Sequence, residues 1–315
     1  MPDAPTQCPG CMQPIAEPDA LFCSHCGCRL QGDQCCTYCG HLLPPEAKFC
    51  SYCGRATDQL TAQEQETQHL LKIGISESDW QSIPVGIYTM GSPESEAERF
   101  DCEHQHDVSL AAFEILKTPV TFDMYDAYCT QDAVQQPDDE SWGRGDRPVI
   151  HVSYWDAVQY CIWLQKQTGW LVRLPTEAEW EYACRAGTTT PFSTGHTISP
   201  QQANYNCHYR YGDAPTADPV QKTTPVFQYP GNPWGLQDMH GNVWEWCASL
   251  YDEDYAGLEL KDASYDVNNH HPRVVRGGSW YNLPGALRCA SRNQLPPDYS
   301  HYRVGFRLVR EQGPK

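Results

Sequence analysis

Four Cys-x-x-Cys pairs within the first 53 residues constrain this chain more than any other feature. Eleven residues separate the first pair from the second, and ten separate the third from the fourth. The first two pairs and the last two pairs each end in a similar sequence, Phe-Cys-Ser-His-Cys-Gly at residues 22–27 and Phe-Cys-Ser-Tyr-Cys-Gly at residues 49–54. The N-terminal segment is therefore an internal repeat with a period of about 27 residues.

This cysteine spacing predicts zinc. One Cys-x-x-Cys turn presents two thiolates to an ion, and two such turns complete the tetrahedral four-sulfur site that suits Zn²⁺. Segments this short bury too little apolar surface to fold alone, so metal would supply their stability. We expect two structural zinc sites in segments that resemble a double zinc ribbon, at residues 1–30 and 31–56; a redox or disulfide role is the alternative. The expected zinc ligands are Cys8, Cys11, Cys23, Cys26, Cys36, Cys39, Cys50 and Cys53.

The charge of the chain argues against nucleic acid as a partner. The formal net charge is −18, whereas phosphate contacts need a surface rich in Lys and Arg. Residues 1–56 also carry more acidic than basic residues, so docking to a protein is the expected role of the ribbons. The sequence has no apolar run long enough to span a bilayer and no signal-peptide pattern at its start. These features predict a cytoplasmic protein that does not contact a membrane.

The character of the sequence changes after a polar linker at residues 57–79. From residue 80 to residue 311 aromatic residues are frequent, Gly and Pro interrupt short segments, and helical patterns are few. This pattern is typical of an α+β domain with many irregular loops. Two helices are predicted from their N-terminal signals. Ser153 precedes a helix that runs through Leu164, and Thr176 with Glu179 forms a capping box for another.

Several characteristic phrases lie along this large domain. They are Lys-Thr-Pro-Val-Thr at residues 117–121, Arg-Leu-Pro-Thr-Glu-Ala-Glu-Trp-Glu-Tyr-Ala at 173–183, Gly-Asn-Val-Trp-Glu-Trp-Cys at 241–247, Arg-Gly-Gly-Ser-Trp at 276–280 and Val-Gly-Phe-Arg at 304–307. In this order they resemble the formylglycine-generating-enzyme (sulfatase-modifying factor) family. The resemblance covers about residues 80–311. It implies an irregular, loop-rich C-type lectin-like fold of the α+β class.

The cysteine pair on which catalysis depends in that family is absent here. In formylglycine-generating enzymes this pair follows the Gly-Gly-Ser-aromatic phrase, binds copper and supports the oxidation of a substrate cysteine by O₂. The corresponding positions hold Asn282 and, near the second, Leu287, while Cys289 is the one thiol nearby in sequence. We find no alternative metal triad in the sequence. Because thiolates are the natural ligands of Cu(I), we expect no copper and no catalytic residues; an O₂-dependent oxidoreductase with relocated metal ligands is the alternative.

The domain also resembles the variable proteins of diversity-generating retroelements. Their variable region lies between an Arg-Gly-Gly-Ser-Trp phrase and a Gly-Phe-Arg phrase near the chain end, which corresponds to residues 276–307 here. The resemblance implies a non-catalytic protein that binds a ligand, more specifically a protein, through diversified loops; a fixed scaffold or regulatory subunit is the alternative. The candidate ligand-binding residues are Tyr281, Asn282, Leu283, Gly285, Ala286, Leu287, Asn293, Leu295, Tyr299, Ser300, His301 and Tyr302. Tyrosines suit this role because they offer large contact area at low entropic cost.

The same resemblance implies calcium as a second metal. It nominates Asn242 and Glu245 in the Gly-Asn-Val-Trp-Glu-Trp phrase as ligands, and Asn204 for a second site. Carboxylate and amide oxygens suit Ca²⁺. In a strand, Glu245 would point away from the two flanking tryptophans, free to meet either a cation or an arginine.

Overall fold

The computed structural model describes residues 72–262 and 270–311. The chain divides after Leu71, and the described residues all belong to the part that begins at Lys72. The expected zinc ligands therefore lie outside the described residues. Ile73 and Ile75 are buried, so the large domain begins several residues before the boundary at residue 80 that the sequence indicated.

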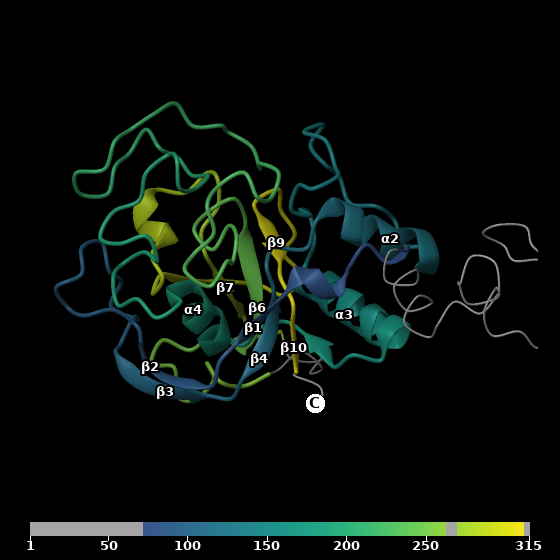
Figure 1. The fold of residues 1–315 in the computed structure, drawn as a ribbon, viewed down its shortest axis with the longest axis horizontal. Coiled ribbons are helices and arrows are strands. Elements are labelled where there is room, and N and C mark those ends of the chain that lie inside the picture. Colours follow the sequence, from purple (N-terminus) through teal and green to yellow (C-terminus); the bar gives the residue numbers. More distant parts are fainter. Residues whose placement is uncertain (1–71, 263–269, 312–315) are drawn as a thin grey trace, which may run out of the picture. The chain divides into compact units, whose positions relative to one another are not determined.

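A four-stranded antiparallel sheet joins the beginning and the end of this domain (Figure 1). In spatial order its strands are β1 (Trp80–Ile83), β4 (Phe113–Leu116), β10 (Val309–Glu311) and β5 (Val172–Arg173). The 3-10 helix η1 (Glu77–Asp79) precedes β1. Arg310 of β10 forms ion pairs with Glu77 and Glu114, so the last strand is tied to the first segment of the domain.

A second four-stranded sheet contains parts of the phrases at residues 241–247, 276–280 and 304–307. Its order is β8 (Arg292–Leu295), β7 (Arg273–Arg276), β6 (Trp244–Leu250) and β9 (Val304–Phe306). The β6–β9 pairing is parallel and the other two pairings are antiparallel. The connection from β7 to β8 contains the 3-10 helix η2 (Pro284–Leu287). A separate antiparallel pair consists of β2 (Gly86–Met90) and β3 (His106–Leu110).

Both predicted helices are confirmed, and each begins with the predicted cap. Ser153 caps α3 (Tyr154–Thr168), and its hydroxyl accepts a hydrogen bond from the backbone N–H of Asp156. The capping box of Thr176 and Glu179 opens α4 (Glu177–Arg185). The remaining helix of the described residues, α2 (Phe122–Asp132), packs beside α3 at one side of the domain, while α4 lies next to β6 and β7 (Figure 1).

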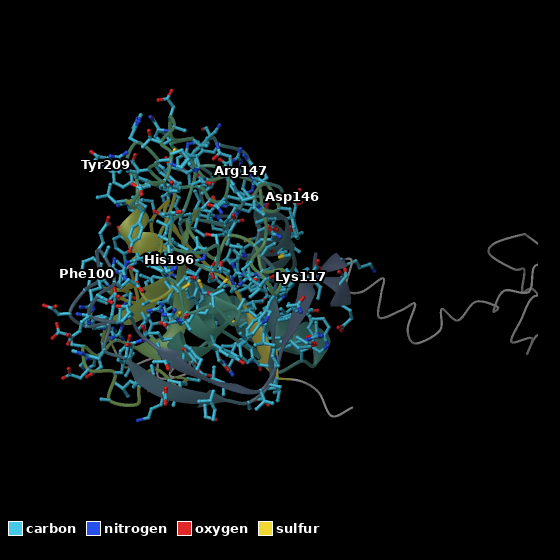
Figure 2. All side chains as sticks on the ribbon, turned by 60° about the vertical axis from the view of Figure 1, so that its left-hand side comes forward. Phe100, Lys117, Asp146, Arg147, His196 and Tyr209 are labelled. Atoms are coloured by element: carbon cyan, nitrogen blue, oxygen red, sulfur yellow. The ribbon has the colours of Figure 1, made fainter. Side chains whose placement is uncertain are left out.

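The long segment from residue 186 to residue 243 contains no named helix or strand within the described chain. Hydrogen bonds to other parts of the domain hold it in place instead. The backbone N–H of Val226 donates to the Asp146 carbonyl at 2.9 Å, and the Arg147 guanidinium donates to the Thr223 carbonyl. Figure 2 labels Asp146 and Arg147, which lie side by side on this part of the domain. The predicted mixture of helices, strands and irregular loops is thus present.

Candidate functional site

The turn after β7 positions the residues that sequence analysis nominated for ligand binding. Gly278 has a φ of +75°, and a Cβ there would lie 2.8 Å from Leu287 Cδ1, so the turn requires glycine. The side chain of Asn282 closes the turn, since its Oδ1 accepts hydrogen bonds from the Ser279 backbone N–H at 3.1 Å and the Ser279 hydroxyl at 2.6 Å. The polar end of Asn282 is thereby engaged within the turn.

An open pocket lies directly beside this turn. Its volume is about 260 Å³, and its lining residues are Asn206, His208, Pro219, Gln221, Trp280 and Tyr281. The Trp280 side chain is largely buried, at 8% exposure, whereas Tyr281 is 55% exposed. The backbone N–H of Asn206 donates to the Asn282 carbonyl at 3.0 Å, which fixes the loop wall of the pocket against the turn.

A continuous series of ring contacts extends from the pocket. We call this the aromatic face, and it consists of Trp142, Trp280, Tyr281, Tyr299, His301 and Tyr302. Trp280 contacts the rings of Trp142, Tyr281 and Tyr302 at centroid distances of 5.5, 5.5 and 5.9 Å. Further contacts join Tyr302 to His301 at 3.9 Å and His301 to Tyr299 at 5.6 Å. Such packing holds aromatic side chains in fixed positions at a surface.

Arg303 and Glu140 are charged residues that act on the aromatic face. The Arg303 guanidinium lies 4.7 Å from the centre of the Tyr281 ring, within the range of a cation–π contact. Burial, followed by the neighbouring charges of Arg303 and His151, lowers the pKa of His301. The imidazole of His301 is therefore neutral at physiological pH, and the face is mainly apolar and aromatic.

Other nominated residues point into the domain. Leu287 is fully buried in an apolar cluster with Phe192 and Tyr205, and Ala286 packs against the same cluster. Gly285 is also buried, and a Cβ at that position would meet Glu98 Oε2 at 2.0 Å. These three residues therefore support the loop from behind. Leu283, in contrast, is 49% exposed.

The last nominated residues occupy β8 and the connection to β9. Asn293 and Leu295 lie on the edge strand β8, where Asn293 is exposed and Leu295 partly exposed. Neither is among the residues that line the pocket. Ser300 is exposed between Tyr299 and His301. The structure thus brings Tyr281, Tyr299, His301 and Tyr302 together through ring contacts that include Trp280, a residue that sequence analysis did not nominate.

Glu245 meets an arginine within the domain. Its two carboxylate oxygens accept hydrogen bonds from Arg307 at 2.7 and 2.8 Å, and Oε2 also accepts one from Trp180 Nε1 at 2.7 Å. All three side chains are fully buried. Of the two partners considered from the sequence, a cation or an arginine, the structure places the arginine there.

The amide side chains nominated for calcium are also engaged by the protein. Asn242 Oδ1 accepts from the Thr224 backbone N–H at 2.9 Å and from Asn204 Nδ2 at 3.2 Å. Asn242 Nδ2 donates to the Thr224 carbonyl at 3.0 Å. A free buried oxygen remains on Asn204, whose Oδ1 has no hydrogen-bond partner in the described chain. The side-chain oxygens of Asn242 and Glu245 are thus engaged within the protein, and calcium binding stays a prediction.

The positions that correspond to the family's copper ligands do not fit copper either. Asn282 is the turn-closing residue described above, and Leu287 offers an apolar side chain inside the domain. No cysteine lines the neighbouring pocket.

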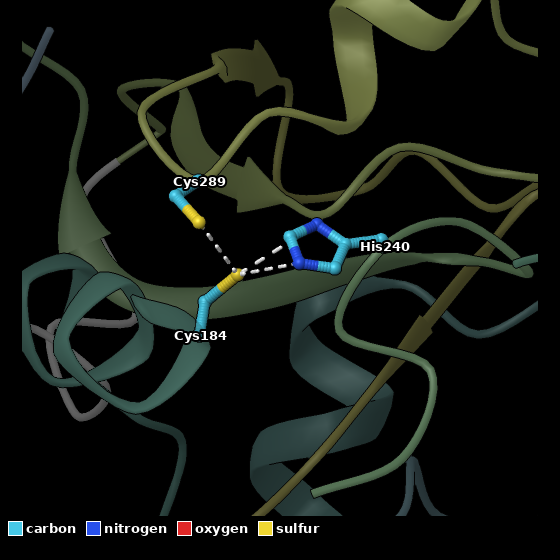
Figure 3. A group of neighbouring side chains, drawn as sticks. All are labelled: Cys184, His240 and Cys289. Atoms are coloured by element: carbon cyan, nitrogen blue, oxygen red, sulfur yellow. Dashed lines mark hydrogen bonds between the residues drawn. The ribbon is translucent and has the colours of Figure 1, made fainter. Parts of the chain in front are cut away.

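Two cysteines far apart in the sequence meet elsewhere in the interior. Cys184 at the end of α4 and Cys289 before β8 have their sulfur atoms 3.6 Å apart. The ring nitrogens of His240 each lie 3.9 Å from the Cys184 sulfur. Figure 3 shows the three side chains, which gather at one point between α4, β7 and the loop before β6. This cluster corrects the conclusion, drawn from sequence alone, that no alternative metal triad exists.

The surroundings of this cluster are dry. Cys184 and Cys289 are fully buried, and His240 is 7% exposed. Burial raises the pKa of the Cys184 thiol well above its usual value and lowers the pKa of His240 to about 4. The His240 ring is therefore neutral. Its Nδ1 lies 2.7 Å from the Leu287 carbonyl, to which only an N–H can donate, so the lone pair is on Nε2.

These features can be compared with known proteins. Residues 74–312 match the family model for the sulfatase-modifying factor enzyme 1-like domain, and the chain therefore belongs to this family. Residues 36–57 match the model for a zinc-ribbon domain. This second match supports zinc binding by Cys36, Cys39, Cys50 and Cys53.

Individual relatives make the comparison more specific. The formylglycine-generating enzyme of Mus musculus is 36% identical over 186 residues, which are 56% of this chain and 48% of the relative. The chain thus spans about half the length of the curated relatives it matches. Among solved structures, PvdO from Pseudomonas aeruginosa superposes with a TM-score of 0.64 at 32% identity, over 74% of this chain and 94% of that one.

A third similar protein carries the name of a variable protein. Treponema denticola variable protein 1 superposes with a TM-score of 0.58 at 22% identity, over 74% of this chain and 94% of that one. At this identity the likeness shows the fold alone. Together the comparisons confirm the predicted α+β, C-type lectin-like fold and the resemblance to the formylglycine-generating-enzyme family.

Proposed function

We propose that the large domain is a non-catalytic binding module whose recognition surface is the aromatic face and its pocket. The observation that carries this proposal is the replacement of the family's two cysteines by Asn282 and Leu287, beside a preformed aromatic pocket. The first replacement closes a turn and the second packs inside. The buried pair of Cys184 and Cys289 is no substitute, because its sulfur atoms are not accessible to a substrate.

The dimensions of the pocket favour a protein as the ligand. A volume of about 260 Å³ is below the range of about 300–1,000 Å³ that is typical of sites for small molecules. It can take one large side chain that projects from a partner. The surrounding aromatic face supplies rigid contact area of the kind that dominates binding energy at protein interfaces.

We further propose that the exposed part of residues 281–302 is diversified by a retroelement. The support is the placement of exposed side chains, among them Tyr281, Leu283, Asn293 and Ser300, on a scaffold fixed by buried neighbours. Loops held by a rigid framework tolerate change at exposed positions. In this proposal Gly285, Ala286 and Leu287 keep the loop in place and do not contact the ligand.

For the N-terminal segment we propose two structural zinc sites and a role in docking to another protein. The match of residues 36–57 to a zinc-ribbon model supports the second site, and the repeated cysteine spacing supports the first.

Two experiments test the binding proposal. One asks whether the fold tolerates changes in the aromatic face, and the other asks whether the protein catalyses oxidation of a thiol by O₂. A variant with Tyr281, Leu283, Tyr299 and Tyr302 all changed to Ser should keep a cooperative unfolding transition in circular dichroism. The parent protein, supplied with copper and a cysteine-containing peptide, should consume O₂ no faster than heat-denatured protein does. Sustained turnover would show an enzyme, and loss of cooperative unfolding in the variant would show that the face is structural.

Diversification is tested in the DNA around the gene. A near-copy of the 3′ end that differs at adenines, next to a reverse transcriptase gene, is the expected result. If no such copy exists, the surface is a fixed binding site and the diversification proposal fails.

A further inference from the structure

Arg303 differs from most arginines of the described chain in having no carboxylate partner there. Arginines such as Arg288 and Arg307 form ion pairs with Glu at 2.7 Å. Glu140, which acts on the same face as Arg303, is engaged by His151 at 2.6 Å. The side chain of Arg303 is also partly exposed to solvent. The domain thus holds one positive charge beside the aromatic face that its own described residues do not neutralise.

Three contacts hold the Arg303 guanidinium in a fixed position. Its Nε donates a hydrogen bond to Nδ1 of His301 at 3.3 Å. The guanidinium carbon lies 4.7 Å from the centre of the Tyr281 ring and 5.7 Å from that of the Tyr302 ring. Because the hydrogen bond uses Nε, the N–H groups of the two terminal nitrogens stay available to a ligand. A side chain held in this way loses little conformational entropy on binding.

The guanidinium lies next to the pocket. Tyr281 forms part of the pocket wall and is also the ring against which Arg303 packs. The residues that line the pocket include no Asp, Glu, Lys or Arg. When a large side chain of a ligand fills the pocket, a neighbouring residue of that ligand comes within reach of the two terminal nitrogens of Arg303.

The chemistry of this arrangement favours a carboxylate. A planar guanidinium matches a carboxylate in a bidentate, charge-assisted pair. Sites for phosphorylated ligands typically use clusters of arginines, whereas Arg303 is the single arginine of the described chain in contact with rings of the aromatic face. The formal net charge of −18 would repel an extended acidic patch, but screening limits this repulsion to about 8 Å at physiological salt. One carboxylate meets these conditions.

We propose that Arg303 binds the carboxylate of an aspartate or glutamate side chain of a protein ligand, close in sequence to the residue that fills the pocket. This inference rests on the binding function proposed above and adds the chemistry of the ligand. The pocket supplies apolar contact and Arg303 supplies the charged pair. A ligand that lacks the acidic residue leaves the guanidinium without its partner and binds more weakly.

The first test selects ligands from a phage-displayed library of random dodecapeptides, whose C-termini are fused to a coat protein and therefore carry no free carboxylate. Parallel selections use the full-length parent, Arg303→Gln and the matched control Lys166→Gln. Lys166 is exposed on α3 and does not line the pocket, so the control loses the same charge elsewhere. Parent and control should enrich peptides with Asp or Glu within two residues of a large apolar residue. Arg303→Gln should enrich peptides with the apolar residue alone.

The second test measures the pair with one synthetic peptide taken from the parent's selection. A version with the neutral amide in place of its acidic residue should bind the parent about 10-fold more weakly, the effect of losing one charge-assisted pair. Both peptides should bind Arg303→Gln with equal affinity. The comparison of the two peptides on the parent decides the matter even where the variant fails to fold.

Equal affinity of the parent for the two peptides overturns the proposal, and so does acidic enrichment that persists with Arg303→Gln. Enrichment of apolar peptides with no acidic preference also overturns it, but leaves the proposed binding function intact. If the parent enriches no peptide above the level of an uncoated support, the binding function itself fails, and this inference fails with it.

Discussion

Replacing Glu245 by Gln distinguishes the arginine partner seen in the structure from the calcium ion that family resemblance implies. Arg307 and Glu245 are both fully buried and share two hydrogen bonds. With Gln at position 245, the guanidinium keeps its bonds to three backbone carbonyls but loses its counter-charge. Breaking one partner of a buried ion pair costs about 3–5 kcal/mol. For a domain of this size, that loss lowers Tm by about 6–20 °C.

The assay is thermal unfolding followed by circular dichroism, with and without added Ca²⁺. Glu114→Gln is the matched control, because Arg310 would keep a second carboxylate partner, Glu77, and no arginine charge would be left unpaired. The Glu245→Gln variant should lose several times more stability than the control, and added Ca²⁺ should leave the Tm of the parent unchanged. If added Ca²⁺ raises the parent's Tm but not that of the Glu245→Gln variant, Glu245 binds calcium and our reasoning is refuted.

Three further predictions concern the loop, pH and zinc. Leu287→Ala should lower the free energy of unfolding by about 2–5 kcal/mol, as for other buried leucines. Leu283→Ala should change it by less than about 1 kcal/mol, because Leu283 is half exposed. Equal effects in urea denaturation would contradict the placement of the two side chains. Burial raises the pKa of Asp238 to about 7, above its value in the unfolded chain. Protonation of Asp238 therefore contributes fully to folding stability below about pH 4, and this contribution declines as the pH rises to 7. The Asp238→Asn variant should therefore gain stability relative to the parent as the pH rises from 4 to 8, by up to about 4 kcal/mol. If the difference between their denaturation midpoints does not depend on pH, the raised pKa of Asp238 is wrong. Cys23→Ser should reduce zinc from two ions per chain to one by metal analysis, and an unchanged content would contradict the ribbon assignment.

Local features of the domain could be predicted because they depend on neighbours in sequence. The caps of α3 and α4 involve residues three positions apart, and both helices begin where the sequence indicated. The characteristic phrases also predicted the fold, since glycines such as Gly278 mark backbone conformations that few other residues adopt. The boundary that the sequence indicated at residue 80 follows Ile73 and Ile75, which are buried in the structure.

The exposed and buried sides of the nominated loop could not be separated from sequence. Tyr281 and Leu287 are equally plausible ligand contacts by residue type. Their difference arises because η2 turns Leu287 towards Phe192 and Tyr205, while Tyr281 remains at the rim of the pocket. The pocket wall opposite comes from the irregular segment around Asn206, for which the sequence contains no periodic signal.

By itself, then, the sequence determined the family, the fold class, the helix starts and the replacement of the family's cysteine pair, because these are properties of local phrases and their order. Only the tertiary structure decided which side chains meet. Glu245 and Arg307 are 62 residues apart, and Cys184 and Cys289 are 105 residues apart. Neither pair has a spacing that indicates contact. The physical reason is that the parallel pairing of β6 with β9 and the long β7–β8 connection bring distant segments of the chain together. Because these segments are buried, their charged groups and thiols can contact only the side chains that the fold places next to them.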